Sequence, residues 1–112
     1  MLAATRTARH TIKTRTRTQR AAARINRNGH ATLATHALAA GLDIRSARSV
    51  AGSLRTAAKK LAITGIATRV HAGRHMRDAV EYTAVQVARI AAAYKPRKAE
   101  YRLVAAKLAL AA

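Results

Sequence analysis

The chain has 112 residues and carries 22 Lys and Arg against 4 Asp and Glu, a formal net charge of +18 at pH 7. This length fits one domain with a modest core, and the absence of Cys excludes a disulfide framework and thiolate metal sites. Because much of the apolar content is alanine and there is no Phe or Trp, we expect the core to be thin and closely packed. A compact chain of this charge repels itself and calls for a polyanion, most simply nucleic acid.

An anionic membrane surface is a weaker candidate, because no stretch pairs a long apolar face with a basic one. No segment has the length of a transmembrane helix or of a signal-peptide apolar region. The first 27 residues are rich in Arg and Thr and contain no acid, as organellar transit peptides do. We favour a retained basic arm, and therefore a cytoplasmic, nucleoid-associated protein, with organellar import as the alternative.

Residues 1–18 are predicted to form this basic N-terminal arm. Thr is a weak helix former and the closely spaced charges repel one another, so we expect the arm to be mobile until it meets an anion. Bound, it would follow phosphates or enter a minor groove. Its basic residues are Arg6, Arg9, Lys13, Arg15 and Arg17.

A short helix is predicted over Gln19–Asn28, with Thr18 as its cap and Gly29 as its stop. An earlier start, at Ile12, is the alternative. Arg20 would lie on the outer side of this helix and extend the basic surface of the arm.

Two further helical patterns meet at a glycine. Gly41 supplies the left-handed residue that ends a helix over Ala31–Ala40, and Asp43 can cap a second helix over about Ile44–Leu61. His36 lies beside the apolar face of the first of these helices. We expect it to be a surface or half-buried packing residue rather than a ligand or a switch.

The second helix divides into two faces on a helical wheel. The apolar arc is predicted to be core and contains Ala47, Val50, Ala51, Leu54, Ala58 and Leu61. The opposite arc has no acid and no large apolar residue and contains Arg45, Arg48, Ser49, Gly52, Thr56 and Lys59. Gly52 destabilises the helix by about 1 kcal/mol relative to Ala. A glycine here would allow close approach to a DNA backbone; the alternative is that the helix simply tolerates this loss of stability.

A β-hairpin is predicted next, because two β-type runs, Ile66–His71 and His75–Thr83, flank Gly73. Arg74 and Arg77, near its tip, are candidates for minor-groove or backbone contacts.

Other polar residues of the hairpin are assigned structural roles. Asp78 and Glu81 are expected to pair across the strands with arginines such as Arg69 rather than to act in catalysis. His71 and His75 sit across a turn with no third ligand, so we predict no metal site.

The order helix, turn, longer helix and β-hairpin resembles the winged helix-turn-helix of small bacterial and phage transcriptional repressors. The resemblance covers about residues 29–83, and the positions that match the helix-turn-helix are Ala37, Gly41, Leu42, Ala47 and Val50. It implies a mainly α fold with a small β-hairpin, in a winged helix-turn-helix domain over residues 19–83 with a basic N-terminal arm.

Residues 84–112 are predicted to form C-terminal helices. A helix over Ala84–Tyr94 would end before Pro96, and a last helix would run over Lys98–Ala112. Its stripe of Tyr101, Val104, Leu108 and Ala111 must cover the core or pair with a second copy. We favour a homodimer through residues 84–112, since two-fold partners read two half-sites, with folding back in a monomer as the alternative.

The sequence contains no phosphate-cradling glycine loop, nucleophile elbow, paired carboxylates or metal ligand set, so we predict neither an enzyme nor a cofactor. We expect double-stranded DNA binding, with the regulator role implied by the resemblance. Arg45, Arg48 and Ser49 would read bases in the major groove. Phosphates would be held by the arm, the hairpin, Arg55, Lys59 and Lys60.

Two alternatives remain open. One is a ribosomal RNA-binding protein of winged-helix type, which the Thr- and Arg-rich arm fits well as a tail between RNA helices. The other is an architectural protein that coats DNA without sequence preference.

Overall fold

Residues 3–110 are described by the computed structural model, except for the side chain of Ala72. In this range the chain is mainly helical, with helices α1 (Ala3–Asn28), α2 (Leu33–Ala39), α3 (Ile44–Lys60), α4 (Ala84–Ala93) and α5 (Ala99–Leu110). Strands β1 (His30–Thr32), β2 (Ile66–Ala72) and β3 (His75–Thr83) form an antiparallel sheet in the order β1-β3-β2.

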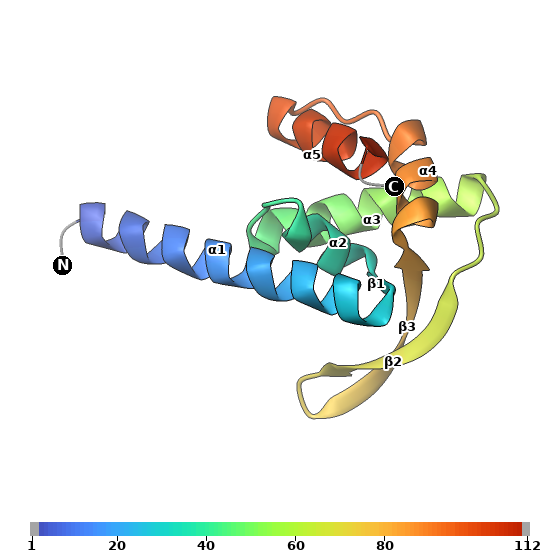
Figure 1. Ribbon diagram of the computed structural model, residues 1–112, viewed down its shortest axis with the longest axis horizontal. Coiled ribbons are helices and arrows are strands. Elements are labelled where there is room, and N and C mark those ends of the chain that lie inside the picture. Colours follow the sequence, from blue (N-terminus) through green and yellow to red (C-terminus); the bar gives the residue numbers. More distant parts are fainter. Residues whose placement is uncertain (1–2, 111–112) are drawn as a thin grey trace.

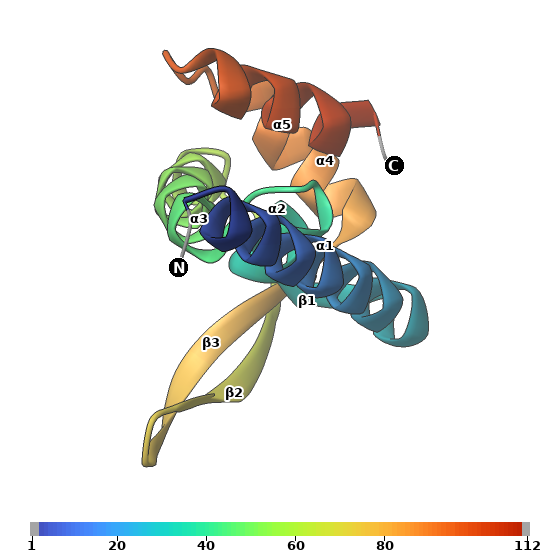
Figure 2. The ribbon, with the colours of Figure 1, turned by 90° about the vertical axis from the view of Figure 1, so that its left-hand side faces the viewer.

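The helices form layers from which the β2–β3 hairpin projects. In Figure 1, α4 and α5 lie above α2 and α3, α1 lies below them, and the hairpin extends downward. Figure 2 gives the same arrangement from the side, with the hairpin and α5 at opposite ends of the molecule. The N-terminal half of α1 extends beyond the other helices.

One core joins α2, α3, α4 and α5. Its largest fully buried side chains are Leu54 and Val50 of α3 and Ile90 and Val87 of α4. The predicted apolar arc of α3 is buried up to Ala58. Leu61 is instead 45% exposed, because α3 ends at Lys60 and the chain turns away.

The turn between α2 and α3 has the predicted chemistry. Gly41 has a φ of 107°, which favours glycine, and the Leu42 amide donates to the Ala37 carbonyl at 3.4 Å. Asp43 caps α3 by accepting a 2.8 Å hydrogen bond from the Ser46 amide. The prediction for this turn is therefore confirmed residue by residue.

The prediction of a non-helical arm over residues 1–18 is wrong for the residues described. Helix α1 begins at Ala3, so Thr18 is an interior residue, not a cap, and neither Gln19 nor Ile12 is the start. Three of its threonines, Thr7, Thr11 and Thr16, donate their hydroxyls to the carbonyl four residues earlier, as Thr16 does to Ile12 at 3.0 Å. The Thr14 hydroxyl is buried without a hydrogen-bond partner. Met1 lies outside the described residues. Gly29, with a φ of 77°, ends the helix as predicted.

A short strand precedes α2 and was not predicted. β1 pairs with β3, with Ala31 opposite Tyr82, and α2 therefore begins at Leu33 rather than at Ala31. Thr32 caps α2 by accepting from the Thr35 amide at 3.3 Å. Three residues are too few for an alternating pattern to be visible in the sequence.

The hairpin is confirmed, with Gly73 at its tip at a φ of 68°. Arg69 lies opposite Asp78 in the register, and their side chains approach to 3.6 Å, as predicted. The prediction for Glu81 is wrong, because its carboxylate pairs with His30 of β1 rather than with an arginine.

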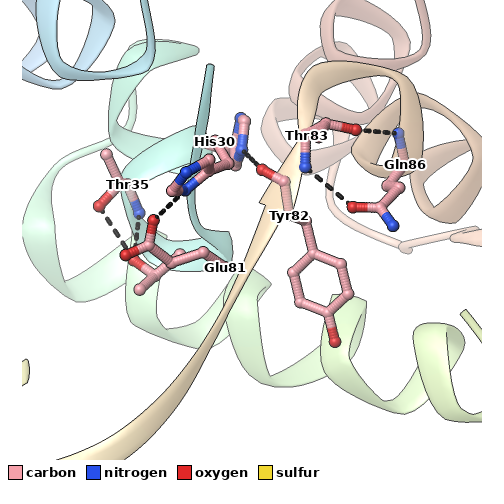
Figure 3. Close-up of polar contacts among 8 residues, drawn as sticks. His30, Thr35, Glu81, Tyr82, Thr83 and Gln86 are labelled. Atoms are coloured by element: carbon pink, nitrogen blue, oxygen red, sulfur yellow. Dashed lines mark hydrogen bonds and ion pairs between the residues drawn. The ribbon is translucent and has the colours of Figure 1, made fainter. Parts of the chain in front are cut away.

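The C-terminal helices pack on the rest of the chain. Thr83 and Gln86 form a reciprocal capping box at the start of α4 (Figure 3). Val104 and Leu108 of α5 are buried in the common core, while Ala111 lies outside the described residues. The inner stripe of α5 thus folds back on its own chain.

Within residues 3–110 no helix has the length and apolarity needed to cross a membrane.

Candidate nucleic-acid interface

The outer side of α3 is basic along its whole length. No acid occurs between Ile44 and Lys60, and the cap residue Asp43 is the acid nearest to this face in sequence. Hydrogen bonds from Ser46 lower the pKa of the Asp43 carboxyl, with smaller contributions from His10 and Arg45. The exposed cations of the helix are Arg45, Arg48, Arg55, Lys59 and Lys60.

An open cavity of about 650 Å³ lies between α3, the hairpin and the C-terminal end of α1. Four cations from these three elements line it: Arg24 of α1, Arg55 and Lys59 of α3, and Arg77 of β3. Residues far apart in the sequence therefore present positive charge to one hollow.

The cations of this cavity have no acidic partner in the described part of the chain. The two acids that also line it are engaged, since Asp78 faces Arg69 and Glu81 pairs with His30. Within residues 3–110, the side chains of these four cations make neither a hydrogen bond nor an ion pair, so their charges are left for an external anion.

Polar contacts fix the base of the hairpin to β1 and α2 (Figure 3). His30 of β1 bonds the Glu81 carboxylate at 2.5 Å. His36 of α2 is 3% exposed and its Nε2 donates to the Tyr82 carbonyl at 2.8 Å. Burial lowers the pKa of His36, against smaller raising effects of the Tyr82 bond and of Glu81. His36 is therefore a buried structural residue, and the prediction of a surface or half-buried position is wrong.

Several predicted site residues come together and others do not. Arg55, Lys59 and Arg77 share the cavity. Arg74 lies beside the hairpin tip, outside the cavity lining. The remaining predicted residues of α3 and α1 are exposed or half-buried on their own helices and do not line the cavity: Arg45, Arg48, Ser49, Gly52, Thr56, Lys60, Arg15, Arg17 and Arg20.

Arg24 belongs to the cavity but was not among the predicted site residues. The missed signal is a spacing of three and four residues between most basic residues of α1, which places them on one face of a helix. This spacing places the residues on one face only if residues 1–18 are helical, whereas a mobile arm was predicted there.

Side-chain clusters of His, Asp and Glu that could hold a metal ion do not occur among the described residues. Comparison of the chain with protein-family models, curated proteins and solved structures finds no match.

Proposed function

We propose that the chain binds double-stranded DNA as a winged helix-turn-helix protein, with α3 in the major groove and the hairpin and the C-terminal end of α1 on the sugar–phosphate backbone. The observation that carries this proposal is the cavity whose four cations, from α1, α3 and the hairpin, have no acid to pair with in residues 3–110. Unpaired cations on a chain of charge +18 favour a polyanion with regularly spaced phosphates.

The position of each polar residue along α3 decides whether we assign it to bases or to phosphates. Arg45, Arg48 and Ser49 lie in the first half of the helix, where residues of a docked recognition helix reach base edges, and arginine can bond guanine in two places. Arg55 and Lys59 lie farther along and face the hairpin, so we assign them to phosphates. The same assignment holds for Lys60, Arg74 and Arg77.

A transcriptional regulator that occludes a promoter is the role we favour. The helical form of α1 weighs against the ribosomal RNA-binding hypothesis. That hypothesis requires an extended Thr- and Arg-rich tail, whereas residues 3–28 form a straight helix. A straight basic helix beside α3 suits a straight duplex.

The first test is selection from a randomised duplex DNA pool in about 0.2 M salt with structured RNA as competitor, since this salt suppresses much of the sequence-independent phosphate attraction. We expect an enriched motif. Retention without a motif would replace the proposal by architectural binding, and displacement by RNA would replace it by RNA binding.

Variants then separate base reading from phosphate contact. Arg45→Ala should cost about 1 to 3 kcal/mol on the selected site and little on other sequences, whereas Lys59→Ala should weaken all sequences alike. The control is Arg102→Ala on α5, at the end of the molecule away from the hairpin. It should change neither the affinity for the selected site nor the affinity for other sequences. Equal losses on all sequences for Arg45→Ala would contradict its base-reading role.

A further inference from the structure

Seven basic residues of α1 lie on one face of the helix. At 100° per residue they fall within an arc of about 80° and span about 30 Å of its length. We call them the α1 stripe: Arg6, Arg9, Lys13, Arg17, Arg20, Arg24 and Arg27. Arg15 is off the stripe, about 160° from its centre.

The core does not explain this stripe. Ala21 is the one buried residue among the 26 of α1, and residues 3–13 are all exposed. Like charges three and four residues apart destabilise a helix, and positive charges near its N-terminus oppose its dipole. No acid relieves this repulsion within α1. The arrangement is therefore unfavourable for the free chain, and a polyanion along the stripe would reverse its effect.

The stripe is continuous with the proposed DNA-binding surface. Arg24, near the middle of the arc, lines the cavity together with Arg55 and Lys59 of α3. Farther toward the N-terminus, His10 lies 3.8 Å from Asp43, the residue that caps α3. Two points along α1 thus place the stripe beside α3, and the N-terminal half of the helix carries it beyond the start of α3 (Figure 1).

We infer that the α1 stripe is a second backbone-binding surface for the same duplex that α3 enters. It extends the interface past the start of α3 and engages phosphates that α3 and the hairpin cannot reach. This inference rests on the proposed duplex binding. It also reassigns Arg15, which faces away from the stripe and takes no part.

The test compares two variants of the full chain that lose the same number of positive charges. The stripe variant is Arg6→Gln, Arg9→Gln, Lys13→Gln and Arg17→Gln. The control variant carries changes off the stripe or on α4, α5 and their connection: Arg15→Gln, Arg89→Gln, Arg97→Gln and Arg102→Gln. Circular dichroism checks that both keep their helix content, and the binding constant for one duplex is measured over a range of salt concentrations.

We expect the stripe variant to reduce the slope of log K against log salt by about 3.6, because each of the four lost phosphate contacts contributes about 0.9. Its nuclease footprint should shorten by about 5 base pairs, the length spanned by residues 6–17 of a helix. The control variant should change the slope by less than about 1 and leave the footprint unchanged.

Failure of each idea has its own signature. A wild-type chain that does not bind duplex DNA overturns the proposed function and the stripe with it. A wild-type chain that binds, with equal slopes for the two variants, overturns the stripe alone. A stripe variant with a reduced slope but an unchanged footprint overturns the placement of the stripe on the same duplex.

Discussion

His36 is buried, at 3% exposure, and it holds the end of β3 against α2 through the Tyr82 carbonyl. A buried imidazole is easier to keep neutral than charged, which is why its pKa lies below the usual 6.5. The neutral and the charged imidazole can both donate to this carbonyl, so protonation keeps the contact but buries a charge, which costs stability.

Acid should destabilise the fold through His36. Because its pKa is lowered in the folded state, the unfolded state binds more protons as the pH falls below about 6.5, so stability is complete above that pH and declines below it. Urea unfolding at pH 7.5 and 5.5 measures the effect. His36→Gln, which keeps a donor for the Tyr82 carbonyl, should reduce this pH dependence. His75→Gln in the exposed hairpin is the control, and equal pH dependence in both variants would contradict the assignment.

At the scale of elements, Gly52 interrupts an otherwise alanine-rich α3 without a structural need. A Cβ placed there meets no heavy atom within 4 Å apart from its immediate chain neighbours and the backbone of its own helix. The glycine lies on the outer face of α3, opposite the buried stripe that contains Leu54. Packing within the chain does not account for it, and a ligand that approaches the helix backbone would.

Gly52→Ala should therefore separate stability from binding. Alanine in an exposed helix interior is favoured over glycine by about 1 kcal/mol, so the melting temperature should rise by about 4 °C. Affinity for duplex DNA should fall about tenfold, equivalent to about 1.4 kcal/mol, because the methyl group occupies the space of the approaching backbone. Melting curves and a binding titration on the same samples decide it. A stabilised variant with unchanged affinity would mean that Gly52 has no role in DNA binding and is merely tolerated by the helix.

Local signals in the sequence predicted most elements correctly. The α2–α3 turn and the hairpin could be predicted because turn and capping residues act within a few positions of the chain. These residues are Gly41, Asp43 and Gly73. The prediction of a non-helical arm failed because it relied on the weak helix propensity of threonine. Over the 26 residues of α1, the higher helix propensity of alanine and arginine outweighs it.

The candidate site was predictable only in part. The outer face of α3 follows from one helical wheel, but the cavity combines Arg24 with Arg77, which lie 53 positions apart in the sequence. Their proximity follows from β1 pairing with β3, a long-range contact too short to be visible as a strand pattern. The partners of His30 and His36 depend on the same pairing.

At the scale of the whole molecule, α5 has two apolar faces, and only one is used. Val104 and Leu108 enter the core, while Leu103 is 67% and Leu110 84% exposed on the opposite side. Ala99, Leu103, Ala106 and Leu110 follow one another at intervals of four, three and four residues. This spacing is that of a helix that pairs with another helix along a single seam.

We propose that a second copy of the chain covers this outer face of α5. Each buried leucine would contribute about 1.5 to 3 kcal/mol, and the charge of +18 on each copy opposes association, so dimers should strengthen as salt rises. Sedimentation velocity across protein concentrations at low and high salt measures this. Leu103→Gln should raise the dissociation constant at least about tenfold, whereas Val85→Gln, at 61% exposure on α4, should not. A chain that stays monomeric at high salt, with no difference between the variants, would contradict the dimer. An inverted repeat in the selected DNA would give each α3 of the dimer its own half-site.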